Sequence, residues 1–379
     1  MTKYQKTMTK LGNCKLVIGI SLYLVSCFLV IPTFASQVLD PTDIGVGARP
    51  LGMGKAFTAI ANDGSAIFTN PAGLAQSHAL NVISMSGNVM AEVPYTMIGG
   101  SYPVLNGTLG IGYVGLGVSG IKETTLVNGT PEITGNEGSF ANSAINISYA
   151  QSLPPNINLS IFKETKVGGT LKLISQGFTG TPSFEGNNAT GFDIDLGALA
   201  SISDDTKAGL TIKNIIPGNN MKSDEIPMSI TAGVSKAFSN LNLLTALDAE
   251  YNRTLLFHGG LEWAPVSMLK IRAGLDQKPS AGASITNMSA GLGLIFKGFT
   301  VDYAYHTYAE LTEFSTHFIS IGYIGEEVRK TKDEAVPAGR QGRGTKEMII
   351  PPTPIPAPVI TTPPPAPKPA IKPKPKKKK

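Results

Sequence analysis

The sequence contains very little cysteine and histidine. Cys14 and Cys27 are the two cysteines among 379 residues, and both precede the position where we expect an export signal to end. The mature chain would contain no thiol, which excludes disulfides and cysteine-metal sites. The four histidines are dispersed, without the paired spacing of a metal site, and we expect no metal.

Long apolar runs are also missing after the first 35 residues. Nothing there reaches the 18 consecutive apolar residues of a transmembrane helix. Motifs of nucleotide chemistry are absent as well: GMGK at residues 52–55 lacks phosphate-loop spacing, and GLGVSG at residues 115–120 has no following helix. No local signature supports a hydrolase, so we predict that the protein is not an enzyme and needs no cofactor.

An export signal is present at residues 1–35. Its basic start comes from four lysines: Lys3, Lys6, Lys10 and Lys15. An apolar run at residues 16–31 follows, and then the small-residue pattern Thr-Phe-Ala that ends at Ala35, where we expect cleavage. A retained signal-anchor helix is one alternative, because the run approaches the roughly 20 residues that span a bilayer. A lipoprotein signal with lipidated Cys27 is another.

Charge is divided unevenly along the chain. The formal net charge is +5, but the signal carries four Lys, and residues 326–379 carry 13 basic against 5 acidic residues. Residues 36–325 therefore have a net charge of −7. A nucleic-acid-binding domain would itself be basic, so we expect no nucleic-acid partner.

Apolar and polar residues alternate with a period of two through the central part of the chain. Phe192, Ile194 and Leu196, for example, alternate with Asp193 and Asp195. This pattern is typical of strands with one apolar and one polar face. In a soluble sandwich the apolar faces would form a core, whereas in a membrane barrel they would face lipid, and periodicity alone leaves both open.

Three features favour the membrane barrel: the export signal, charges on the polar strand faces, and aromatic residues near strand ends. The aromatics are Tyr95, Tyr102, Trp263, Tyr303, Tyr305 and Tyr323, as an interface girdle requires. Short turns near residues 103–107, 204–206 and 264–267 alternate with longer loops near residues 119–138, 179–189 and 277–285. We predict an all-β fold, a transmembrane antiparallel β-barrel of about 14 strands in the bacterial outer membrane.

The predicted strands start near the following residues: Leu80, Tyr95, Thr108, Phe140, Val167, Gly191, Lys207, Met228, Leu241, Thr254, Met268, Thr286, Phe299 and Phe314. The chain then divides into a signal at 1–35, a segment at 36–76 before the first strand, a barrel at 77–325 and a tail at 326–379. An even strand number places both ends of the barrel on the periplasmic side.

Several motifs resemble those of a known group. They are ARPLGMGKAF at residues 48–57, NPAGL at 70–74, FDIDLGA at 192–198, GLTIKN at 209–214, DYAY at 302–305 and THFISIGY at 316–323. In this pattern the chain resembles the PorV/PorQ-type outer-membrane proteins, which are related to the long-chain fatty-acid transporter (FadL-like) barrels. Pro50 and the Pro/Lys-rich tail depart from the pattern.

This resemblance implies that the N-terminal segment occupies the lumen as a hatch. The residues that it implicates are Gly52, Gly54, Asn70, Pro71 and Ala72. Local chemistry agrees with an ordered turn here, because Asn70 is a good N-cap and Pro71 suits a first helical position. The alternative is a generic loop.

Six charged or titratable side chains are predicted on lumen-facing positions of the C-terminal half. They are Glu262, Lys270, Arg272, Asp276, Asp302 and His306. They are candidates for a polar ligand contact or a selectivity patch. Opposite charges across adjacent strands also hold strands in register, and we favour this structural interpretation.

The tail is too rich in proline to pack and is expected to extend as polyproline II, with seven Lys in its last twelve residues. Such an arm would reach into the periplasm and could bind anionic peptidoglycan by charge. We predict a non-enzymatic barrel, in contact with outer-membrane lipid, that passes a hydrophobic small molecule or docks an exported protein cargo. The alternative is a structural anchor tethered to the cell wall by its tail.

Overall fold

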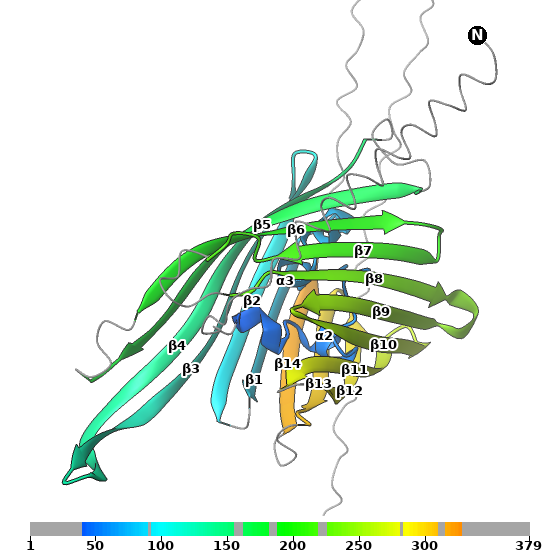
Figure 1. The fold of residues 1–379 in the computed structure, drawn as a ribbon. Coiled ribbons are helices and arrows are strands. Elements are labelled where there is room, and N and C mark those ends of the chain that lie inside the picture. The colour runs from blue at the N-terminus through cyan, green and yellow to red at the C-terminus, as the bar shows by residue number, and fades with distance from the viewer. Residues whose placement is uncertain are drawn as a thin grey trace, which may run out of the picture. The chain divides into compact units, whose positions relative to one another are not determined.

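The computed structural model describes residues 40–89, 92–154, 162–181, 188–218, 226–280, 283–309 and 315–327. The predicted signal, and the tail beyond Glu327, lie outside these residues. The described chain forms a closed barrel of 14 antiparallel strands, which confirms the predicted fold class (Figure 1). None of the described helices is long and apolar enough to cross a membrane.

The strands follow one another around the barrel in chain order, and β1 closes it by pairing with β14. Their bounds are β1 Asn81–Val89, β2 Val93–Val104, β3 Gly107–Val127, β4 Thr130–Ser152, β5 Glu164–Thr179, β6 Ala189–Ser201, β7 Thr206–Lys213, β8 Ser229–Phe238, β9 Leu243–Asn252, β10 Thr254–Val266, β11 Leu269–Ser280, β12 Ala283–Phe296, β13 Phe299–Thr307 and β14 Ser315–Ile324. All predicted strand starts except that of β4 lie within about three residues of these, because alternation and turn chemistry are local signals.

The barrel carries its apolar side chains outside. On β6, Phe192 and Ile194 are exposed on the outer face, while Asp193 and Asp195 are buried on the inner face. The same arrangement, with apolar side chains outside and polar ones inside, recurs on β3, where Leu109 is exposed and Thr108 is buried. Polar residues inside and apolar residues outside are the arrangement of a membrane-spanning barrel, so the alternative of a soluble sandwich is wrong.

The barrel has two rims, and one of them carries both the start of the first strand and the end of the last. β1 begins and β14 ends at the same rim, because Asn81 pairs with Ile324; we call this the terminal rim and the opposite one the loop rim. The loop expected near residues 119–138 is instead a continuation of β3 and β4, which turn at Asn128 and Gly129. That pair of residues takes positive φ at both positions, the conformation of a tight hairpin turn.

The prediction that all six aromatics lie at the membrane interface is wrong for one of them, Tyr95. Trp263 and Tyr102 are exposed on the outside of the barrel, but Tyr95 is completely buried on its inner side. The Tyr95 hydroxyl donates to the carbonyl oxygens of Pro41 and Gly45, both at 3.0 Å. Tyr95 therefore supports the N-terminal segment rather than the membrane interface.

Residues 40–76 lie inside the barrel, and we call them the inner segment (Figure 1, blue). It contains four short helices: η1 Pro41–Ile44, α2 Ala48–Gly52, α3 Ala66–Thr69 and η2 Pro71–Gln76. A further short helix, η3 Ser239–Leu241, forms the turn between β8 and β9. Large apolar side chains of the inner segment, such as Phe57 and Phe68, are almost completely buried against the inner face of the wall.

Glycine allows this close contact. A Cβ atom at Gly54, which has a φ of +59°, would lie 2.4 Å from the backbone nitrogen of Leu275 on β11. The wall and the inner segment therefore meet backbone to backbone at this point, which only glycine permits.

Candidate functional site

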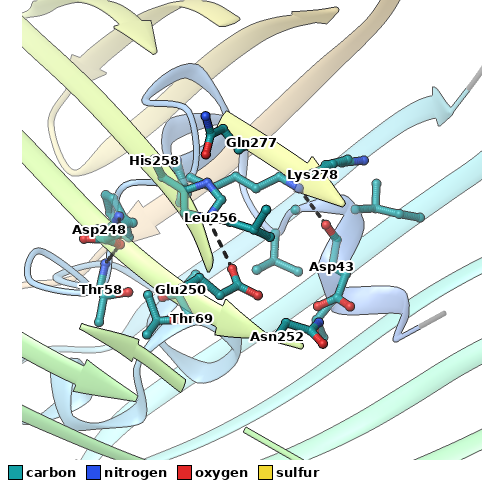
Figure 2. Close-up of a pocket in the computed structure, with 18 of the residues that line it drawn as sticks. Asp43, Thr58, Thr69, Asp248, Glu250, Asn252, Leu256, His258, Gln277 and Lys278 are labelled. Carbon is teal, nitrogen blue, oxygen red and sulfur yellow. Dashed lines mark hydrogen bonds and ion pairs between the residues drawn. The ribbon is translucent and has the colours of Figure 1, made fainter. Parts of the chain in front are cut away.

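A cavity of about 460 Å³ lies between the inner segment and the loop-rim half of the wall. Strands β7 to β12 supply most of its wall, and residues 42–58 supply its floor. Figure 2 shows Asp43, Thr58, Leu256 and His258 around this space. The cavity has the size of small-ligand sites, which are typically about 300 to 1,000 Å³.

The lining of the cavity is mixed in character. Apolar contacts come from Ile44, Val46, Phe57, Leu256 and Ile285. Polar and charged groups come from Asp43, Lys55, Lys213, Glu250, His258 and Lys278. Predominantly apolar walls with a few converging polar groups are typical of sites that bind small molecules.

One hydrogen-bonded link lies in the floor of the cavity and another lies in its wall. Lys55 Nζ donates to the backbone oxygen of Asp43 at 2.6 Å, and this bond joins η1 to the stretch that follows α2. His258 Nε2 and Glu250 Oε2 lie 3.2 Å apart on neighbouring strands. Lys55 has a φ of +62°, which is rare for a residue with a side chain, and the links around it must offset that conformational cost.

Asp248 on β9 holds the floor to the wall. Its Oδ2 atom accepts from the backbone nitrogens of Phe57 at 3.0 Å and Thr58 at 2.9 Å. Charge-assisted bonds of this kind are about twice as strong as neutral ones. The wall thereby fixes the stretch of the inner segment that lines the cavity.

A buried charge cluster fastens the start of the inner segment. Lys172 Nζ on β5 lies 2.8 Å from Asp40 Oδ2, 2.8 Å from Asn214 Oδ1 and 3.2 Å from Asp195 Oδ2. Lys172 and Asp40 are both completely buried. Burial alone would raise the pKa of Asp40, but the Lys172 ammonium outweighs it and holds that pKa well below its usual range. We call these four residues the latch.

The stretch that follows β7 is hydrogen-bonded to β6 beside the latch. Pairing between β6 and β7 covers only the part of β6 from Leu196 onward. Beyond it, the backbone nitrogen of Asn214 donates to Asp195 Oδ1 at 2.9 Å, and that of Ile216 donates to Asp193 Oδ1 at 2.9 Å. Beyond the end of β7, these side-chain acceptors on β6, together with the backbone bond from Ile215 N to Ile194 O at 3.2 Å, therefore satisfy the backbone nitrogens of residues 214–216.

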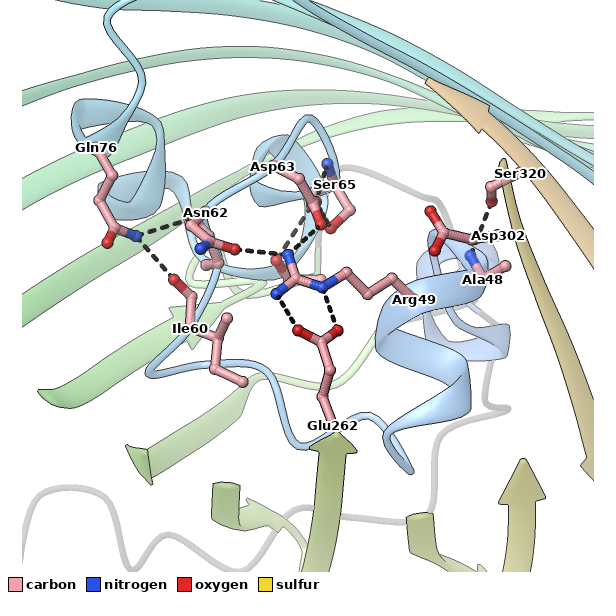
Figure 3. Close-up of polar contacts among 12 residues, drawn as sticks. Ala48, Arg49, Ile60, Asn62, Asp63, Ser65, Gln76, Glu262, Asp302 and Ser320 are labelled. Atoms are coloured by element: carbon pink, nitrogen blue, oxygen red, sulfur yellow. Dashed lines mark hydrogen bonds and ion pairs between the residues drawn. The ribbon is translucent and has the colours of Figure 1, made fainter. Parts of the chain in front are cut away.

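A second charge cluster surrounds Arg49 of the inner segment (Figure 3). Its guanidinium binds both carboxylate oxygens of Glu262, at 2.8 and 3.1 Å, and Oδ2 of Asp63 at 3.1 Å. Arg272 also binds Glu262, at 2.7 Å, and reaches Asp302 Oδ1 at 2.6 Å. Bidentate arginine pairs give geometric specificity, so this cluster sets the position of α2 against the wall.

Five of the six predicted lumen residues fall into two groups. Glu262, Arg272 and Asp302 join the Arg49 cluster, while Asp276 Oδ1 lies 2.6 Å from His306 Nε2 near the cavity. The sixth, Lys270, lies on the same face of β11, but within the described residues it forms no ion pair with either group.

The predicted hatch residues all belong to the inner segment, and they contact either another part of that segment or the wall of the barrel. Asn70 Nδ2 donates to the carbonyls of Thr58, at 2.8 Å, and Ala198, at 3.2 Å, while its Oδ1 accepts from Ala72 N at 3.1 Å. Pro71 is the first residue of η2.

The two predicted hatch glycines meet the wall. A Cβ at Gly52 would lie 3.1 Å from the Cα of Gly291 on β12, and Gly54 N donates to Ser289 Oγ at 3.0 Å. The structure therefore brings the C-terminal end of α2, and the turn that follows it, against β12.

Sequence reasoning missed Lys172 and Asp248, and it assigned Tyr95 to the membrane interface instead of to the support of the inner segment. The pattern Leu171-Lys172-Leu173 places Lys172 on the inner face of a strand, and this signal would have identified a buried lysine. Its partner Asp40 lies 132 residues away, and no local pattern identifies that pair. Among the described residues, no group of three or more His, Cys, Asp or Glu is arranged to hold a metal.

Solved structures with a similar fold include two toluene transporters. The toluene transporter TbuX of Ralstonia pickettii matches with a TM-score of 0.55 at 13% identity, over 74% of this chain and 99% of that chain. The toluene transporter TodX of Pseudomonas putida matches with a TM-score of 0.52 at 13% identity, over 77% and 98% of the two chains. At this identity the likeness shows the fold alone. No protein-family model matches the chain, and no curated protein matches it in sequence.

Proposed function

We propose that the protein is an outer-membrane barrel that passes a hydrophobic small molecule through its lumen, with the inner segment as a hatch. The observation that carries this proposal is the cavity of about 460 Å³ between the inner segment and the loop-rim half of the wall. Its apolar lining suits a hydrophobic ligand, and its polar groups would orient one end of it. The toluene transporters share the fold, which adds support.

Passage requires that the inner segment move, because it fills the barrel on the terminal-rim side of the cavity. The contacts that must change are hydrogen bonds and ion pairs, such as those of Asp248 with Phe57 and of Arg49 with Glu262. No covalent step is involved. A ligand promotes the open state only if it binds that state more tightly than the closed one.

The first test fills the cavity. Leu256 lines it and is almost completely buried, while its neighbour Leu255 points outward and is 55% exposed. We expect Leu256→Trp to reduce binding of toluene and of palmitate to the detergent-purified barrel by at least about tenfold, because the indole occupies ligand volume. Leu255→Trp is the matched control and should bind as wild type.

Each variant is first checked for folding by heat-modifiable migration on gels. Equal binding by the Leu256→Trp and Leu255→Trp barrels would refute passage through this cavity. Mass spectrometry of co-purifying lipid then shows whether wild-type protein carries a hydrophobic molecule from the cell.

A second test locks the inner segment. Ala48 N donates to Ser320 Oγ at 2.8 Å, so the two side chains lie close together on α2 and β14. We expect the pair Ala48→Cys and Ser320→Cys to form a disulfide that stops uptake of toluene into cells and that dithiothreitol reverses. Unchanged uptake by the oxidised pair would refute movement of α2. Each single cysteine variant is the control.

Docking of exported protein, the PorV/PorQ-type role, and tethering by the tail are separate proposals. The tail from residue 328 lies outside the described residues. Deletion of residues 349–379 tests the tether: passage should persist, while sedimentation of the barrel with purified peptidoglycan should be lost. Persistent sedimentation would refute the tether.

A further inference from the structure

Strands β3 and β4 continue well past their neighbours. They contain 21 and 23 residues, whereas β5, the next longest, has 16. Pairing of β2 with β3 stops at Leu116, and pairing of β4 with β5 stops at Ser139. We call residues 117–138 the arm; Figure 1 shows the two strands running together beyond the rest of the barrel. At about 3.3 Å per residue, the arm is roughly 30 Å long.

The arm is organised internally. Lys122 lies opposite Glu137 across the ladder. Glu123 Oε2 accepts from Thr134 Oγ1 at 2.9 Å and from Asn136 Nδ2 at 2.8 Å. These contacts hold the hairpin in one shape, although a two-stranded ribbon by itself is only marginally stable in water.

The two edges of the arm differ. The β4 edge carries Pro131 and Gly135, whose φ is +87°, and both features discourage a further strand. The β3 half contains Gly120, whose φ is +74°, and its ladder with β4 shifts register between Lys122 and Thr124, but from residue 124 to 127 it pairs regularly with β4, and no described strand pairs with it on the β2 side. An edge of this kind is a template for an added strand.

One face of the arm is apolar at its tip. Leu126 pairs with Pro131, and Thr124 pairs with Ile133, so these four side chains share a face. Leu126 is 72% exposed and Ile133 is 62% exposed. Exposed apolar side chains beside an open strand edge supply the pockets and contacts that an added strand uses.

Charge indicates the kind of partner. The arm contains Lys122 and three acids, Glu123, Glu132 and Glu137, for a net charge of −2. Two copies of the arm would repel each other, whereas a basic segment would be attracted. We propose that the β3 edge of the arm docks an extended, basic segment of a partner protein, which adds a strand beside residues 124–127. This proposal does not rest on ligand passage, because the arm residues do not line the cavity.

The test uses the full barrel in detergent and a fluorescein-labelled ten-residue peptide that alternates Lys with Val and Thr. Ser119 and Ser139 face each other in the ladder, so residues 120–138 can be replaced by an Asn-Gly turn without changing the strands below. We expect this arm-less barrel to bind the peptide at least about tenfold more weakly than wild type by fluorescence anisotropy. Its heat-modifiable migration and its binding of palmitate should be unchanged, which separates this test from that of the cavity.

A charge-reversal series sharpens the test. Glu132→Lys should weaken binding of the basic peptide about fivefold, and Glu132→Gln should weaken it less, in line with two and one units of lost attraction. A peptide with Glu in place of Lys should show the opposite order. Equal peptide binding by wild-type and arm-less barrels would overturn the proposal. Concentration-dependent dimers that vanish with the arm, without peptide binding, would also overturn it in favour of a second copy.

Discussion

Asp40 and Asp43 are three residues apart at the same short helix, η1, yet they lie in opposite environments. Asp40 is completely buried in the latch against Lys172. Asp43 faces the cavity and is exposed to it. Enclosure by the barrel, together with the negative charges of Asp40 and Glu250, raises the pKa of Asp43 to about 7, whereas that of Asp40 is lowered.

The difference shows that η1 is held in place at Asp40, whereas the contacts of Asp43 at the cavity can change. A buried ion pair resists opening, because each partner would be left as an uncompensated charge. A carboxyl at a cavity can change its protonation or its partner at little cost. If the inner segment moves, we therefore expect the cavity side to move before the latch.

The largest effect should come from Lys172→Met. This change leaves Asp40 and Asp195 buried without their cation, and loss of one partner of a buried pair costs about 3 to 5 kcal/mol of unfolding free energy. Urea unfolding of the barrel in detergent measures it. A loss below about 1 kcal/mol would mean that the latch does not hold the inner segment.

The control for that variant removes the stranded acids as well. Lys172→Met combined with Asp40→Asn and Asp195→Asn should recover much of the lost stability, since neutral isosteres often replace buried ion pairs at little net cost. If the triple variant is as unstable as Lys172→Met, the loss comes from packing rather than from charge.

A smaller effect is expected from pH at Asp43. Its folded pKa of about 7 exceeds the ordinary value of 3.8, so the folded protein binds more protons than the unfolded chain between these values. The contribution of Asp43 to stability therefore falls as pH rises from about 4 to about 7. Amides of residues 42–47 should be less protected at pH 8 than at pH 5, after correction for intrinsic exchange, as hydrogen exchange can measure.

Asp43→Asn is the control for the pH effect, because it removes the titrating group and keeps the shape of the side chain. In this variant the difference in protection between pH 5 and pH 8 should disappear. A difference of the same size in the variant would assign the pH effect to another group.

The smallest effect concerns Lys55, whose φ is +62°. Lys55→Ala and Lys55→Gly both lose the bond to Asp43, but glycine adopts this conformation without strain. We expect Lys55→Gly to be more stable than Lys55→Ala by about 1 kcal/mol in urea unfolding. The reverse order would show that the backbone at this position is not strained.

Some parts of this molecule are readable from local sequence, and others are not. Alternation such as Phe192 against Asp193 gave the strands, and the Asn128-Gly129 pair is the kind of turn signal that marks a hairpin. The arm was nevertheless predicted as a loop, because its polar, glycine-containing residues lack an apolar face along most of their length. Tyr95 was assigned to the membrane interface, because alternation does not say which face points inward.

By itself, the sequence determined the number of strands, the approximate starts of all of them but β4, and the fact that each strand has one apolar and one polar face, since periodicity and turn chemistry act over a few residues. The tertiary structure alone decided which charges meet. Lys172 contacts Asp40, which lies 132 residues away in the sequence, and Arg49 contacts Glu262, which lies 213 residues away. Such pairs depend on the closed barrel, because closure sets the register that brings distant strands to the same depth.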